Sequence, residues 1–374
     1  MVDIYLDHNA TTPVRPEAAA AVAEALAQNG NASSVHRHGR LARRTIDDAR
    51  ESVAALVDAP AANLVFTSGG TEANNQALRG VPGALLVSAV EHDSVLGARD
   101  DANTVAVDGD GVLDLARLGE ELARRDGPGL VSVMLANNET GVLQPGVEIA
   151  AIAHEHDWLV HCDAVQAAGK IEVSFRDLGV DLMSVSAHKL GGPQGVGALV
   201  VRDGLDLAPL MRGGGQERRR RAGTENRAGI TGFGVAAAMA RQGLDAMQGL
   251  ASLRDEMEAR ILAAVPEAVL HGAGVERMPN TSCIGLPSKT AETQVIALDL
   301  AGVAVSAGSA CSSGKVTPSH VLRAMGLDDN AAQNAIRVSL GWNSSAEDVD
   351  RFVDAWTAMA NGSAKDESPR RSVA

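Results

Sequence analysis

The sequence contains few aromatic residues, few cysteines and no long apolar run. Phenylalanine, tryptophan and tyrosine make up 2% of its 374 residues, so alanine and aliphatic side chains must supply most of any buried area. The three cysteines, Cys162, Cys283 and Cys311, cannot all pair, and their scatter does not fit a disulfide framework. No apolar run approaches the roughly 18 residues of a membrane helix, and the first residues include acids where a signal peptide carries bases. We therefore expect a cytoplasmic protein that has no membrane partner and at least one free thiol.

Basic residues are fewer than acidic residues in this sequence. Lysine and arginine total 33 against 47 aspartates and glutamates, and the net charge of −14 repels phosphate backbones and anionic lipid headgroups. The one basic run, residues 218–221, is short, and we interpret it as a solvated turn. We therefore expect no nucleic-acid partner.

Apolar and β-branched runs alternate with helical patterns from about residue 16 to 330, which is typical of an α/β fold with a largely parallel sheet. Strands are expected at residues 64–67, 85–89, 130–135, 158–162, 182–185 and 198–201, and helices at 16–28, 42–57 and 147–156. A long helix is expected over residues 246–264, followed by strands at 281–286 and 336–340. This change of pattern indicates a second, smaller domain, which also suits the length of the chain.

Polar residues follow several of these strands, and ligands in open α/β sheets bind beyond the carboxyl ends of strands. Gly70 and Thr71 open a helix after the first strand, an arrangement that suits a phosphate, although a tight connection is an equally good interpretation. Asp163 and Lys189 follow two other strands and should meet at one sheet edge. They could form an ordinary ion pair, but a lysine in a desolvated pocket can also form a Schiff base with an aldehyde.

Eight short motifs, taken in order, resemble a known family. The first five are similar to the class-V aminotransferase-like fold, and all eight together resemble cysteine desulfurases of the NifS/IscS type. The resemblance extends to about residue 360. The motifs are residues 6–12 (LDHNATT), 67–72 (TSGGTE), 137–141 (NNETG), 161–166 (HCDAVQ), 186–189 (SAHK), 221–224 (RAGT), 306–311 (SAGSAC) and 336–341 (IRVSLG).

The resemblance implies the fold known as PLP-dependent transferase fold type I. A large domain with a mostly parallel seven-stranded sheet would bind the cofactor over residues 12–240. A smaller α+β domain would comprise residues 1–11 and 241–360, with a mobile cysteine loop at about 308–319. Residues 361–374 are polar and aperiodic, and we expect a disordered tail there.

The resemblance also implies pyridoxal 5′-phosphate bound covalently to Lys189. Asp163 would hydrogen-bond the pyridine nitrogen, which makes the ring an electron sink. His92 would stack on the ring as a catalytic residue. Thr224 would reach the phosphate of the other subunit, so the active form would be a homodimer. The remaining cofactor contacts implied are Gly70, Thr71, Ser186 and His188 at the phosphate, and Asn138 and Gln166 beside the ring and its phenolic oxygen.

For the substrate, the resemblance implies L-cysteine, with its carboxylate held by Arg337 and Asn31. A bidentate guanidinium suits that task, although Arg337 could also be a surface charge on a strand. Cys311, in a loop of small residues, would act with Lys189 and His92 in catalysis and take the sulfur as a persulfide, leaving alanine. The sulfur would pass to an acceptor protein, such as an iron–sulfur scaffold or a tRNA-thiolation enzyme, with transient iron–sulfur ligation by Cys311 as a further possibility.

Three alternatives stay open at this point. A selenocysteine lyase or a cysteine sulfinate desulfinase would use the same fold and cofactor residues, and a non-catalytic sulfur-transfer scaffold is the third. A metal site is not expected, because His154 and His156 are two residues apart and would not share a helix face. Cys162 and Cys283 lie in apolar strand-like runs and are interpreted as structural.

Overall fold

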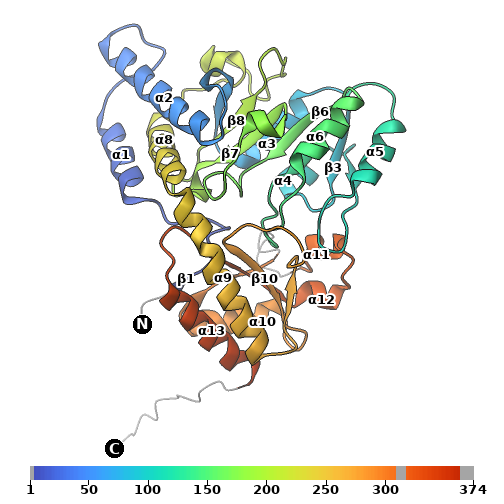
Figure 1. Ribbon diagram of the computed structural model, residues 1–374. Coiled ribbons are helices and arrows are strands. Elements are labelled where there is room, and N and C mark those ends of the chain that lie inside the picture. Colours follow the sequence, from blue (N-terminus) through green and yellow to red (C-terminus); the bar gives the residue numbers. More distant parts are fainter. Residues whose placement is uncertain (1–3, 309–316, 363–374) are drawn as a thin grey trace, which may run out of the picture.

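The computed structural model describes residues 4–308 and 317–362. The described residues form a seven-stranded, a four-stranded and a two-stranded sheet. The seven-stranded sheet and its helices lie uppermost in Figure 1, and the two smaller sheets lie with other helices below them. Cys311, and the tail from residue 363 onward, lie outside the described residues. None of the described helices is both long enough and apolar enough to cross a bilayer.

The larger sheet has seven strands in the order β2-β8-β7-β6-β5-β3-β4. The pairs from β7 through β6, β5 and β3 to β4 are parallel, whereas β8 is antiparallel to both of its neighbours. Every residue of β5, β7 and β8 is buried, which explains their largely apolar sequences, because helices cover both faces of such a sheet. The strands are β2 (Leu64–Thr67), β3 (Ala84–Ser88), β4 (Asn103–Val105), β5 (Gly129–Met134), β6 (Leu159–Asp163), β7 (Leu182–Ser186) and β8 (Gly197–Val201).

Eight α-helices accompany this sheet in the described part of the chain. α8 packs against α1 and α2 at one flank, and α5 packs against α6 at the other (Figure 1). The helices are α1 (Pro16–Ala27), α2 (Arg37–Leu56), α3 (Gly70–Gly80), α4 (Asp93–Leu96), α5 (Leu115–Ala123), α6 (Gly146–Glu155), α7 (Phe175–Leu178) and α8 (Arg227–Gln242).

The second sheet is antiparallel, in the order β12-β13-β10-β9, and has its own apolar core. Its strands are β9 (Val269–His271), β10 (Thr281–Gly285), β12 (Ser306–Ala307) and β13 (Ala335–Ser339), and its helices are α9 (Leu244–Ala264), α10 (Ala291–Leu300), α11 (His320–Ala324), α12 (Asp329–Gln333) and α13 (Ala346–Ala360). The N-terminal strand β1 (Ile4–Tyr5) pairs in parallel with β11 (Val303–Ala304), and Asp7 bridges to Ser339. The beginning of the chain is therefore built into this second, C-terminal assembly.

The α/β class and the mostly parallel seven-stranded sheet are confirmed, and every expected strand exists within one residue of its predicted limits. The helix expected to begin at residue 42 was placed wrongly, because α2 begins at Arg37. His36 caps it by accepting a hydrogen bond from the backbone N–H of Gly39. The first turn of α2 is polar, so apolar periodicity could not reveal it.

Candidate active site

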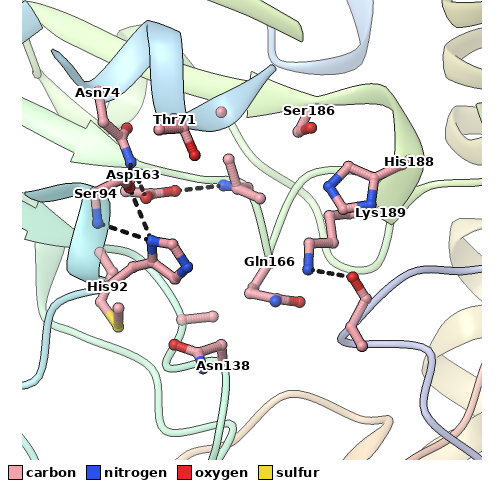
Figure 2. A pocket seen from close by; sticks show the side chains of 15 residues that line it. Thr71, Asn74, His92, Ser94, Asn138, Asp163, Gln166, Ser186, His188 and Lys189 are labelled. Carbon is pink, nitrogen blue, oxygen red and sulfur yellow. Dashed lines mark hydrogen bonds between the residues drawn. The ribbon is translucent and has the colours of Figure 1, made fainter. Parts of the chain in front are cut away.

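A cavity of about 290 Å³ lies beyond the carboxyl ends of β5, β6 and β7 (Figure 2). Of the ten residues that the resemblance assigns to the cofactor, nine line this cavity, and Thr224 is the exception. The polar residues that follow these strands therefore lie together at one edge of the sheet. The lining residues are Ala10, Gly70, Thr71, Asn74, His92, Ser94, Met134, Ala136, Asn138, Asp163, Val165, Gln166, Ser186, His188 and Lys189.

Asp163 is the last residue of β6 and presents its carboxylate to the cavity. Its Oδ2 accepts a hydrogen bond of 2.7 Å from Nδ2 of Asn74, and its Oδ1 accepts one of 3.0 Å from the backbone N–H of Val165. Both donors are uncharged, so they orient the carboxylate without neutralising it. The carboxylate can therefore serve as a fixed partner for a protonated ring nitrogen.

His92 caps α4 on the same side of the cavity as Asp163 (Figure 2). Its Nδ1 lies 2.8 Å from Oγ of Ser94 and accepts a 3.1 Å hydrogen bond from the backbone N–H of that serine. The same Ser94 Oγ accepts from Nδ2 of Asn74, which in turn holds Asp163. One hydrogen-bonded chain therefore fixes both the imidazole and the carboxylate.

Lys189 ends the short 3₁₀ helix η2 (Ala187–Lys189) directly after β7, across the cavity from Asp163 and His92 (Figure 2). Its Nζ donates to the backbone oxygens of Asn9 and Ala10, the latter at 2.8 Å. Beside it, burial and the positive charges of Lys189 and Lys170 lower the pKa of His188 to about 4. His188 is therefore neutral near pH 7 and can act as a hydrogen-bond donor or acceptor.

The N-terminus of α3 forms the part of the cavity that suits a phosphate. Its cap residue, Gly69, has a positive φ of 157° and supplies no capping side chain for the first N–H groups of the helix. A Cβ on Gly70 would lie 2.9 Å from Cγ2 of Val165, so the backbone approaches the cavity wall closely there. Oγ of Ser186 is buried without a hydrogen-bond partner among the described residues. An orphaned hydroxyl next to a helix N-terminus fits an anionic group, so these residues fit pyridoxal phosphate.

Arg337 comes from β13 of the second sheet and reaches the edge of this site. Its side chain is only 6% exposed, so the alternative of a surface charge is wrong. One guanidinium nitrogen lies 2.7 Å from Oδ1 of Asp7, and another donates to the backbone oxygen of Asn138 at 3.0 Å. Its Nε is buried and has no hydrogen-bond partner in the described part of the chain. Arg337 thus adjoins the cavity and retains an unused donor.

Two of the expected residues are not brought to the cavity. Asn31 is exposed, and its side-chain oxygen accepts from the backbone N–H of Ser33 at 2.8 Å, so its substrate role stays a prediction. Thr224 lines a separate hollow of about 110 Å³ together with Thr67 and Ser68. Its role toward a second subunit also stays a prediction.

Three polar residues that hold the site residues in place were not predicted from the sequence. Asn74 lies one helical turn after Gly70, so the spacing along α3 could have placed both on the cavity face. Ser94 could have been identified by its position two residues after His92, as a partner for a capping side chain. Lys170 contacts the nearby Gln166 but also Asn9, which is 161 residues earlier, and nothing in the sequence indicated this second contact.

Cys162 and Cys283 are both buried free thiols, as expected for structural cysteines. Burial raises the pKa of Cys162 and that of Cys283 well above the ordinary thiol value, so neither is a reactive thiolate near pH 7. In the described ranges no group of three or more histidine, cysteine or acidic side chains is arranged to hold a metal ion.

The model of the class-V aminotransferase family matches residues 4–352. The chain belongs to this family. Its curated relatives include the cysteine desulfurase of Cereibacter sphaeroides, 44% identical over 95% of both chains, and the cysteine desulfurase IscS of Dictyoglomus turgidum, 41% identical over 94% of this chain and 93% of the relative. Among solved structures, the NifS-like protein of Rickettsia africae superposes with a TM-score of 0.89 at 33% identity, covering 96% of this chain and 99% of the other. The family is PLP-dependent, in agreement with the fit of the cavity.

Proposed function

We propose that this chain is a cysteine desulfurase that converts L-cysteine to L-alanine and takes the sulfur onto Cys311 as a persulfide. The observation that carries the proposal is the cavity, in which Lys189 faces Asp163 and His92 beside a helix N-terminus that suits a phosphate. Pyridoxal phosphate bound there would supply an electron sink for the substrate's α-carbon. The identity of 40–44% to curated cysteine desulfurases supports the same reaction.

Each side chain then has a task set by its position. Lys189 would hold the cofactor covalently, and Asp163 would keep the ring nitrogen protonated. His92 would lie against the ring, with Asn138 and Gln166 beside it. Gly70, Thr71, Ser186 and His188 would hold the phosphate, and Thr224 would complete the phosphate site of the other subunit in a homodimer.

Arg337 would bind the carboxylate of L-cysteine, with Asn31 assisting it. The supporting observation is its buried guanidinium, which has an unused Nε and lies against Asn138 of the cavity wall. A guanidinium fixed by Asp7 at one nitrogen can still offer two parallel N–H groups to a second carboxylate.

Residue Cys311 lies outside the described residues, but both ends of its segment adjoin the site. Oγ of Ser319 donates to Oε2 of Glu139 at 2.6 Å, and a Cβ on Gly308 would lie 2.5 Å from the same oxygen. Glu139 directly follows Asn138, which lines the cavity. This placement supports Cys311 as the sulfur-accepting thiol.

Several finer points belong to the same proposal. The persulfide would pass to an acceptor protein, such as an iron–sulfur scaffold or a tRNA-thiolation enzyme, in the cytoplasm, where a reducing environment keeps the thiol free. We also propose that residues 12–240 form the large domain and that residues 1–11 and 241–360 form the small one. The separate apolar core of the second sheet, which includes Ile4 and Leu6, supports that division.

The test is incubation of the cofactor-loaded protein with L-cysteine, followed by intact-mass measurement and alanine quantification. Wild type should gain one sulfur per chain on Cys311 and release alanine, whereas Cys311→Ala should bind the cofactor normally but gain no sulfur. Ser312→Ala is the matched control and should behave as wild type. Sulfur release by Cys311→Ala at the wild-type rate would overturn the assignment, and a preference for selenocysteine or cysteine sulfinate would favour the alternative activities.

A further inference from the structure

A second lysine, Lys170, is buried beside the active-site amine. It is 4% exposed and does not line the cavity. Its Nζ donates to Oδ1 of Asn9 at 2.8 Å and to Oε1 of Gln166 at 2.9 Å. Both acceptors are neutral amides, and within the described ranges no carboxylate forms an ion pair with Lys170. Burying an amine without a counter-charge is costly, so this arrangement calls for a reason beyond packing.

The charges around Lys170 do not compensate for its burial. Lys189 and Arg337 face it with positive charge, and together with burial, the largest cause, they lower the pKa of Lys170 well below its ordinary value. His8 and His188 also face it, and burial is the main reason that the pKa of each falls to about 4. The carboxylate of Asp7 is paired with Arg337 and not with Lys170.

The contacts of Lys170 converge on the groups that hold the active-site lysine. Nε2 of Gln166 donates to the backbone oxygen of Asn9 at 3.0 Å, and Nζ of Lys189 donates to the same oxygen. Lys170 holds the side-chain oxygen of Asn9, which also accepts from Nδ2 of Asn280 at 3.2 Å. Asn9 is thus held from both its side chain and its peptide group, between Lys170 and Lys189.

The same contacts fix which way the Gln166 amide points. Because its oxygen accepts from Lys170, its NH₂ group must point the other way, toward Asn9. Gln166 lines the cavity, so its second N–H is the polar group left to face a ligand. An amide held in this way presents an N–H group to the cavity. This N–H favours a negatively charged oxygen as its partner and disfavours a second hydrogen-bond donor.

We propose that Lys170 is a positioning residue, which locks the Gln166 amide as a hydrogen-bond donor toward the cofactor ring. The inference rests on the proposed function, because it assigns Gln166 to an anionic oxygen of pyridoxal phosphate. Lys170 itself touches neither the cofactor nor the substrate.

The experiment measures the affinity of the cofactor-free protein for pyridoxal phosphate, from the visible absorption of the bound form, and the pH at which that absorption changes. Lys170→Met, an unbranched apolar substitution, should weaken binding about tenfold, as expected for the loss of a hydrogen bond to a charged group. Lys170→Gln keeps an N–H donor and should recover most of the affinity. Gln166→Leu should weaken binding by itself, and adding Lys170→Met to it should cause no further loss, because the two residues act as one unit.

The outcomes distinguish a failure of the proposed function from a failure of the role assigned to Lys170. A wild-type protein that binds no pyridoxal phosphate would contradict the proposed function. If wild type binds pyridoxal phosphate, two results would overturn the role of Lys170 alone. One is wild-type affinity in Lys170→Met, and the other is a loss of affinity in the double substitution equal to the sum of the Lys170→Met and Gln166→Leu losses. If Lys170→Met does not fold, the double substitution still decides. It replaces both members of the Lys170–Gln166 hydrogen bond with apolar groups, and Oδ1 of Asn9 still accepts from Nδ2 of Asn280, so the protein should remain folded, with the affinity of Gln166→Leu.

Discussion

Substitution of Arg337 by lysine separates substrate binding from structural support. In the structure the guanidinium contacts Oδ1 of Asp7 and the backbone oxygen of Asn138 through different nitrogens, and its Nε is unused. A lysine ammonium keeps the charge but is a single point, so it can replace only one of these contacts well. It cannot present two parallel N–H groups to a carboxylate.

The magnitude follows from the contacts that Arg337→Lys removes. Losing one charge-assisted hydrogen bond to L-cysteine should cost about 1.5–3 kcal/mol of binding, which raises KM by roughly tenfold to a hundredfold. The carboxylate carries the same charge throughout the reaction, so kcat should change little. Loss of the Asn138 contact should also lower the melting temperature. Initial rates of alanine formation over a range of L-cysteine concentrations give both constants.

Asp7→Asn is the matched control. It removes the ion pair with Arg337, whose two side chains are 6% and 20% exposed, but leaves the guanidinium intact. It should therefore lower the melting temperature without raising KM, because a competing carboxylate has been removed. Equal increases of KM in Arg337→Lys and Asp7→Asn would refute the reasoning, since they would show that Arg337 acts only by supporting the local structure.

Two further predictions concern stability. His161 is fully buried between Oγ of Ser132 and Oγ of Ser184, and burial lowers its pKa from 6.5 to about 4, so the unfolded chain takes up the proton first as the pH falls. Wild type should therefore lose about 2 kcal/mol more unfolding free energy than His161→Gln between pH 7 and pH 5, measured by urea unfolding, and equal losses would contradict it. Glu217→Gln leaves the guanidinium of Arg50 buried without its bidentate partner and should cost about 3 kcal/mol. Adding Arg50→Met should recover part of that loss in the same urea assay, and a further additive loss would count against the ion-pair explanation.

Much of the fold was readable from the sequence because its strands are buried on both faces. Such strands appear as continuous apolar runs, and the polar residues that end them, such as Asp163, mark the edge where ligands bind. The strand β4 was missed because two of its three residues are exposed and it lies at the sheet edge. Its sequence therefore carries little apolar signal.

The site was readable only in part, for a different reason. The residues in recognisable motifs, such as Lys189 and Asp163, reach one cavity because parallel strands end at a common edge. The supports of these residues depend on contacts between distant segments. Lys170 appears in the sequence as an ordinary charged residue in a turn, and only the folded chain shows that Asn9 and Gln166 surround it.

The course of the N-terminal segment determines when the site can be assembled during synthesis. The backbone N–H of Asn9 donates to Oγ of Ser339, 330 residues later, and β1 pairs with β11. The residues that hold the Lys189 amine therefore leave the ribosome long before Ser339 but reach their final position only after that serine has been made. The nascent chain can form the larger sheet early, but the cofactor pocket is complete only after β13 of the second sheet has been made.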